Sequence, residues 1–241
     1  MSLVEKSFSC AVNVYDQIAW IQPLVAARLA TRLQGNPSRI LEVGCGTGAL
    51  SIHLKKRFPE AELVFTDISL SMLELCKAKL NGAGVFKVMD GERPDPSLGH
   101  FDLITSSLAF QWFEDLPEAI RLLSKQLLPG GKIQFSTLGK ENFQEWQGLL
   151  KKHDLPSGLQ LYPGVKTFPW PMGTLGKVEE EFITEDHDSG AAFLKALKLI
   201  GAGTPRRGYQ PLKPEAIKRL LLETSQGFQA TYHILYGYFT I

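Results

Sequence analysis

The feature that most limits the fold is an alternation of short apolar strands with helical patterns across the first half of the chain. Segments that favour strands lie at Arg39–Val43, Glu62–Thr66, Gly84–Met89, Phe101–Ser106 and Lys132–Thr137. Helical patterns lie between them at Ala49–Phe58, Ser69–Leu80 and Leu116–Leu127. Such alternation with short connections predicts a parallel sheet that is covered by helices on both faces.

Small or polar residues follow three of these strands. They lie directly after Val43, at Asp67 and at Asp90. Ligands of open parallel sheets bind beyond the carboxyl ends of the strands. The sequence therefore predicts that these three positions belong to one binding site.

The second half of the chain is less regular. It begins with a helical pattern at Glu141–Lys152, followed by a stretch rich in proline and glycine. Strands are predicted at Lys177–Thr184 and Phe228–Thr240, with helices at Gly190–Ile200 and Pro214–Thr224 between them. We interpret residues 186–226 as a helical cap inserted before the last strand.

The segment LEVGCGTGAL, residues 41–50, places Gly44, Gly46 and Gly48 between a strand and a helix. Glycines allow a tight turn and a close approach of backbone N–H groups to a ligand. The same loop also fits the dinucleotide pattern GxGxxG/A through Gly44, Gly46 and Ala49, with Asp67 lying 23 residues after Gly44. On the loop alone, a nicotinamide or flavin protein remains an alternative.

Glu42 distinguishes the two interpretations. It lies two residues before Gly44, where a dinucleotide loop usually has an apolar residue. A carboxylate there is suited to anchoring the loop or facing an ammonium group. S-adenosylmethionine has an amino-acid end, a ribose and a base. Glu42 with the glycines, then Asp67, then Asp90 would meet these parts in that order.

Five segments resemble the class I S-adenosylmethionine-dependent methyltransferases: ILEVGCGTG (40–48), FTDIS (65–69), MDGE (89–92), FDLITSSLAFQW (101–112) and LLPGGKIQFST (127–137). The resemblance implies an α/β, Rossmann-like fold with a seven-stranded, mostly parallel sheet, an antiparallel last strand, helices on both faces and a small helical cap. It implies one methyltransferase domain over residues 1–241 with a cofactor-binding core at 39–140. The residues assigned to the cofactor are Glu42, Gly44, Cys45, Gly46, Gly48, Asp67, Ile68, Met72, Asp90, Gly91 and Ser107.

A narrower resemblance connects the chain with the malonyl-acyl-carrier-protein O-methyltransferases of biotin synthesis. It is carried by FSCAVNVYDQIAWIQ (8–22), the pair Gln111-Trp112, LKALKLIGA (194–202) and ATYHILYGYF (230–239). It implies methylation of the free carboxylate of a malonyl thioester on acyl carrier protein, under an N-terminal helical lid at 8–34. Tyr15 is expected to orient the carboxylate as the catalytic residue, and Gln111 and Trp112 to contact the substrate.

Charge is unevenly distributed in the cap region. Residues 190–241 contain seven Lys or Arg and two acids, whereas residues 179–188 contain six acids and no Lys or Arg. Acyl carrier proteins are acidic, so a basic cap is suited to docking one. We assign Lys198, Arg206 and Arg207 to the substrate; a solvated helix face explains the same charges equally well.

Several function classes are disfavoured. The net charge of +1 gives no global attraction to nucleic acid, and no NPPY-like tetrapeptide follows the fourth strand. Three widely spaced cysteines predict neither disulfides nor a metal site. The chain lacks a signal-peptide pattern and an apolar run of about 18 residues, so we expect a cytoplasmic protein. Methylation of a free small acid or quinone precursor, and cofactor binding without catalysis, remain alternatives.

Overall fold

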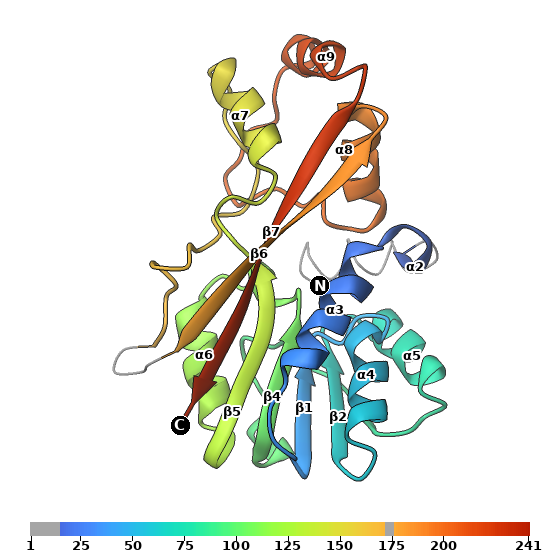
Figure 1. The fold of residues 1–241 in the computed structure, drawn as a ribbon, viewed down its shortest axis with the longest axis vertical. Helices are drawn as coiled ribbons and strands as arrows, with labels where there is room; N and C mark the ends of the chain where they lie inside the picture. Colours follow the sequence, from blue (N-terminus) through green and yellow to red (C-terminus); the bar gives the residue numbers. More distant parts are fainter. Residues whose placement is uncertain (1–14, 172–175) are drawn as a thin grey trace.

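The computed structural model describes residues 15–171 and 176–241 (Figure 1). A seven-stranded sheet with the order β3-β2-β1-β4-β5-β7-β6 forms its centre. The strands are β1 (Arg39–Val43), β2 (Glu62–Asp67), β3 (Val85–Val88), β4 (Phe101–Ser107), β5 (Leu127–Leu138), β6 (Lys177–His187) and β7 (Phe228–Thr240). β1 to β5 pair in parallel, and β7 runs antiparallel to both β5 and β6. The predicted mostly parallel sheet with an antiparallel last strand is confirmed.

Helices cover both faces of the sheet. The helices of the described residues are α2 (Tyr15–Ile18), α3 (Ile21–Arg32), α4 (Ala49–Arg57), α5 (Leu70–Lys79), α6 (Leu116–Ser124), α7 (Gln144–Lys152), α8 (Gly190–Leu199) and α9 (Pro214–Glu223). Two short 3-10 turns, η1 (Pro96–Leu98) and η2 (Phe110–Trp112), flank β4.

The two faces have separate apolar cores because side chains alternate along each strand. Ile40 and Phe65 pack in the cluster that contains the buried residues of α3, α4 and α5. Leu41 and Val64, their immediate neighbours in sequence, pack in a second cluster with the buried residues of α6. The central strands are therefore apolar on both sides, as expected for strands covered on both faces.

β6 and β7 extend beyond the rest of the sheet. β7 pairs with β5 only from Ile234 to Thr240, whereas it pairs with β6 from Phe228 to Tyr238. The first residues of β7 and the last residues of β6 thus form a two-stranded ribbon. This ribbon extends away from the core. The chain that connects its two strands contains α8 and α9, and α7 lies beside the ribbon (Figure 1).

Helix α3 is tied to β6 and β7 by a cluster of charged and aromatic side chains. Arg28 Nη1 lies 2.6 Å from Glu181 Oε1, and the Tyr236 hydroxyl donates to Glu181 Oε2 at 3.0 Å. The guanidinium of Arg32 lies 4.0 Å above the Tyr236 ring centroid. Part of the acidic stretch seen in the sequence is thereby paired within the molecule.

β5 differs most from its expected bounds. β5 begins at Leu127 rather than Lys132, because Leu127 already pairs with Phe101. The register then shifts before Leu103 pairs with Lys132, and Gly130 has a φ of +77°. The Pro129–Gly131 segment therefore interrupts the pairing within the strand instead of preceding it.

Part of the predicted lid, residues 8–14, lies outside the described residues. Of that segment the structure places α2 and α3, which follow it. Among the described helices, none combines the length and the apolar character that crossing a membrane requires.

Candidate active site

A cavity of about 600 Å³ lies at the carboxyl ends of β1, β2 and β4. The loops after β1 and β3, the segment after β4, and residues of helices α2 to α6 complete its walls. Most residues assigned from the sequence meet here: the cavity is lined by Tyr15, Glu42, Gly44, Cys45, Gly46, Asp67, Ile68, Met72, Asp90, Gly91, Ser107 and Trp112.

The glycine loop packs closely against the segment that follows β4. Gly44 has a φ of +70°, and a Cβ at this position would lie 2.4 Å from the Cβ of Ala109. A side chain is therefore excluded both by the backbone conformation and by the neighbour. Gly48, also assigned to the cofactor, does not line the cavity. It is the left-handed N-cap of α4, where a Cβ would lie 3.1 Å from Cys76 Sγ.

Glu42 is a buried carboxyl group in the cavity wall. Its side chain is 1% exposed, and its Oε2 accepts a hydrogen bond from Ser51 Oγ at 2.6 Å. Burial raises the pKa of Glu42 well above its ordinary value, and the Ser51 hydrogen bond opposes that shift. A carboxyl group in this setting is stabilised in its ionised form when a cation binds beside it.

Asp67 connects the ends of β1 and β2. Its Oδ2 accepts from the backbone N–H of Gly46 at 2.8 Å, and its Oδ1 accepts from that of Ser69 at 2.8 Å. Burial raises the pKa of Asp67, while these backbone hydrogen bonds oppose the shift. The carboxyl group thus holds the glycine loop in place and also borders the cavity.

Asp90 and Gly91 form the wall contributed by the segment after β3. Asp90 Oδ1 accepts from the backbone N–H of Glu92 at 3.0 Å. A Cβ on Gly91 would lie 2.6 Å from Val43 Cγ1 and 2.7 Å from Phe113 Cζ. Glycine at 91 therefore allows the β3 segment, β1 and the segment after β4 to meet around one space. Met72, which is 2% exposed, reaches the same cavity from α5.

Several lining residues carried no clear signal in the sequence. Gln22 comes from α3, and Phe113 and Glu118 come from the chain after η2. The sequence signal nearest to Phe113 is the Gln111-Trp112 pair, which Phe113 directly follows. In all, seven carboxyl side chains and one guanidinium line the cavity: Glu42, Asp67, Asp90, Glu92, Glu114, Asp115 and Glu118, with Arg93. Such a lining favours a ligand with positive charge.

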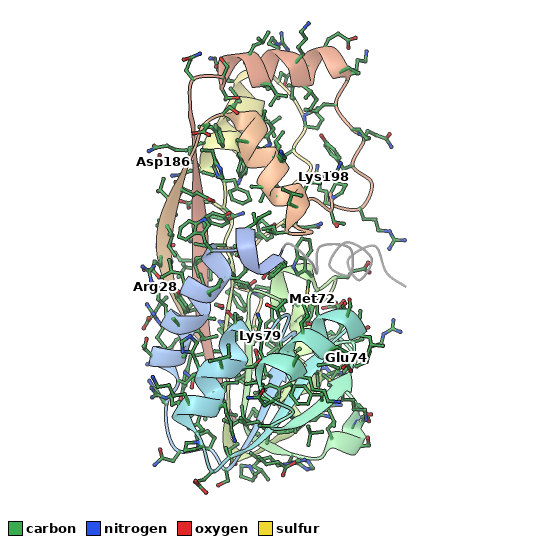
Figure 2. The ribbon with its side chains drawn as sticks, turned by 90° about the vertical axis from the view of Figure 1, so that its right-hand side faces the viewer. Arg28, Met72, Glu74, Lys79, Asp186 and Lys198 are labelled. Carbon is green, nitrogen blue, oxygen red and sulfur yellow. The ribbon has the colours of Figure 1, made fainter. Side chains whose placement is uncertain are left out.

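Four residues assigned to the substrate do not line the cavity. Gln111 turns its amide back, so that its Nε2 donates to the Leu108 carbonyl at 2.5 Å. Lys198 is exposed on α8, and Arg206 and Arg207 lie in the loop between α8 and α9. Figure 2 shows Lys198 on the cap above the helix that carries Met72, on the same side of the molecule.

Comparison with solved structures supports the fold. The YcgJ protein from Bacillus subtilis matches with a TM-score of 0.57 at 15% identity, covering 90% of this chain and 97% of that one. The plantazolicin methyltransferase BpumL, solved with a pentazolic analogue and SAH, matches with a TM-score of 0.50 at 16% identity, covering 98% and 96% of the two chains. At such identities, the likeness concerns the fold alone.

Sequence comparison is more specific. A family model described as a methyltransferase domain matches residues 40–131. The malonyl-acyl-carrier-protein O-methyltransferase of Magnetococcus marinus is 43% identical over 98% of this chain and 92% of its own length. The bifunctional biotin biosynthesis protein BioCD of Bordetella avium is 39% identical over 97% of this chain and 51% of its length. The corresponding enzyme of Anoxybacillus flavithermus is 31% identical over 97% of this chain and 95% of its length. The chain therefore belongs to the malonyl-acyl-carrier-protein O-methyltransferase family.

Proposed function

We propose that this protein transfers the methyl group of S-adenosylmethionine to the free carboxylate of a malonyl thioester carried by acyl carrier protein, in biotin synthesis. The proposal rests on membership of the family, with similarity over 97–98% of this chain. The observation in the structure that carries it is the acidic cavity at the carboxyl edge of the sheet, beneath a cap rich in Lys and Arg.

The described residues fit S-adenosylmethionine. Glu42 offers a buried carboxyl group to an ammonium group, and the glycine loop offers a surface without side chains at Gly44. Asp67 and Asp90 offer carboxylate oxygens to the ribose and the base. A sulfonium and an ammonium against one carboxylate give the cofactor a net positive charge, which matches the acidic lining.

The acceptor chemistry requires little beyond positioning. When bound, S-adenosylmethionine supplies a methyl group on a sulfonium, which a carboxylate oxygen attacks in line as the thioether leaves. A malonyl carboxylate is already ionised at neutral pH, so it needs no general base. Tyr15 and Trp112 would orient and enclose the carboxylate, which is a contribution of proximity.

The cap is the proposed docking surface for the carrier protein. Its Lys and Arg side chains between 190 and 241 form no ion pair with the acids in the described part of the chain. Asp186, on the acidic strand β6, and Lys198, on α8, lie on opposite sides of the cap (Figure 2). An acidic carrier protein approaching the cap would be steered by this charge.

The test is incubation of the purified protein with methyl-labelled S-adenosylmethionine and malonyl-acyl carrier protein, with malonyl-coenzyme A and free malonate in parallel. We expect base-labile label on the carrier protein, well above the other two acceptors. Preferential labelling of free malonate would replace the proposal with a small-acid methyltransferase. Cofactor binding without labelling of any acceptor would favour a non-catalytic role.

Tyr15→Phe tests the residue proposed to orient the acceptor. We expect a lower kcat with an unchanged affinity for S-adenosylhomocysteine, because the phenol would contact the carboxylate rather than the cofactor. An unchanged kcat would assign Tyr15 to packing.

A further inference from the structure

The cavity wall that follows β4 turns at a residue with an unusual backbone conformation. Leu108 has a φ of +51°, in the left-handed region that residues with a branched side chain rarely occupy. Ser107, Leu108, Ala109, Trp112 and Phe113 all line the cavity. The conformation of Leu108 therefore decides where this wall lies.

The backbone of Leu108 is held from both sides. Its N–H donates to the carbonyl of Ser136 on β5 at 3.0 Å. Its carbonyl accepts from Gln111 Nε2 at 2.5 Å, and Gln111 Oε1 in turn accepts from Thr137 Oγ1 at 3.4 Å. Both ends of the Gln111 amide are thus used in bracing the wall against β5.

The residues next to Gln111 give this brace a fixed base. Phe110 is 1% exposed, and its ring centroid lies 4.9 Å from that of Phe113 and 4.8 Å from that of Phe135. The turn η2 is therefore anchored in the core. Ala109, directly after Leu108, packs against the glycine loop, where a Cβ on Gly44 would lie 2.4 Å from its own Cβ. A shift of the wall would change its contact with the glycine loop.

We propose that Gln111 is a positioning residue, whose amide holds Leu108 in the left-handed turn and thereby sets the wall Ser107–Phe113 against the glycine loop. This role replaces direct contact with the substrate, which we expected from the sequence. It rests on the proposed function only in taking S-adenosylmethionine or its product as the ligand of the cavity.

The experiment compares Gln111→Ala, Gln111→Glu, Leu108→Gly and the double variant Gln111→Ala/Leu108→Gly. The probe is S-adenosylhomocysteine, with its affinity measured by calorimetry and Tm recorded for each protein. Gln111→Glu is the matched control: it keeps the size of the side chain and an acceptor for Thr137, but it places a carboxylate oxygen against the Leu108 carbonyl.

We expect Gln111→Ala and Gln111→Glu each to weaken S-adenosylhomocysteine binding about tenfold, the factor that corresponds to the energetic penalty of a left-handed non-glycine residue. Glycine occupies this region without strain. In the Leu108→Gly background, Gln111→Ala should therefore weaken binding by less than about threefold, and this coupling is the signature of action through Leu108.

Three outcomes would overturn the inference. Equal effects of Gln111→Ala in both backgrounds would mean that Gln111 does not act through Leu108. An unchanged affinity with a raised KM for malonyl-acyl carrier protein would return Gln111 to the substrate. A lower Tm with unchanged affinity would leave it a purely structural role. Failure of the proposed function is distinct, because the unsubstituted protein would then fail to methylate malonyl-acyl carrier protein, whatever the Gln111 variants do to binding of the probe.

Discussion

At the scale of single residues, the site is dominated by carboxyl groups that are used before any ligand arrives. Both carboxylate oxygens of Asp67 accept hydrogen bonds from backbone N–H groups of the chain, and the bond from Gly46 orders the glycine loop. Glu42 has Ser51 as a hydrogen-bonding partner for Oε2 and is buried beside the cavity. Since burial disfavours the charged form, Glu42 makes the unliganded protein less stable at the pH where it would ionise.

The pH dependence of Glu42→Gln follows from this raised pKa. Below the unfolded pKa of about 4.3, Glu42 is protonated in both states and favours neither. As the pH rises from there toward the higher folded pKa, the unfolded chain ionises first and the unliganded wild type loses stability. We expect Glu42→Gln to raise Tm at neutral pH, with the difference vanishing near pH 4. A constant difference across this range would show that ionisation is not the cause.

The same variant should bind the cofactor more weakly. A hydrogen bond from an ammonium group to a carboxylate is worth about 1.5–3 kcal/mol, so we expect a loss of roughly 10- to 100-fold in affinity for S-adenosylmethionine. Calorimetry at neutral pH measures this directly. Equal affinity of the two proteins would place the ammonium group elsewhere.

At the level of helices and strands, some glycines are required because two elements pack too closely there for a side chain, whereas others have open space beside them. Gly91→Ala should destabilise the protein by about 1–3 kcal/mol, because its Cβ would overlap Val43 and Phe113, which belong to different elements. Gly148 on α7 is the matched control, since a Cβ there meets nothing within 4 Å. Gly148→Ala should stabilise the protein by about 0.5–1 kcal/mol. Urea unfolding of both variants checks the pair, and loss of stability in both would contradict the packing argument.

For the molecule as a whole, the acidic charge of the cavity should affect the binding of two related ligands differently. The acidic cavity attracts S-adenosylmethionine, whereas S-adenosylhomocysteine has lost the sulfonium charge and is neutral overall. Salt screens such interactions over about 10 Å at 0.1 M ionic strength. We therefore expect rising salt to weaken binding of S-adenosylmethionine several-fold more than that of S-adenosylhomocysteine. Parallel salt dependences, measured by calorimetry, would argue against a role for the acidic lining.

The cap is basic, and its proposed ligand, the carrier protein, is acidic. Reversing Arg206 and Arg207 to Glu should raise the KM for malonyl-acyl carrier protein about tenfold at low ionic strength and flatten its salt dependence. Reversing Lys55 and Lys56, exposed on α4, is the control of equal charge and should leave this KM unchanged. If both reversals raised the KM equally, the effect would come from the net charge of the protein, and the cap would not be the docking surface.

The parallel core and most residues that line the cavity at the strand ends could be predicted from local patterns. This was possible because strand periodicity and glycine placement are local signals, and the carboxyl ends of parallel strands necessarily meet at one edge. Val43, Asp67 and Asp90 could therefore be placed together without coordinates.

Which side chains point into the cavity could not be predicted from the sequence, because it depends on how the elements pack. Gln111 lies next to Trp112 in sequence, yet its amide turns to Leu108 while Trp112 lines the cavity. Gln22 enters from α3, where nothing in its local pattern marks it. The extension of β6 and β7 into a ribbon likewise depends on pairing between strands that lie about 50 residues apart. Side-chain direction and long-range register arise from packing between elements, which local sequence patterns do not record.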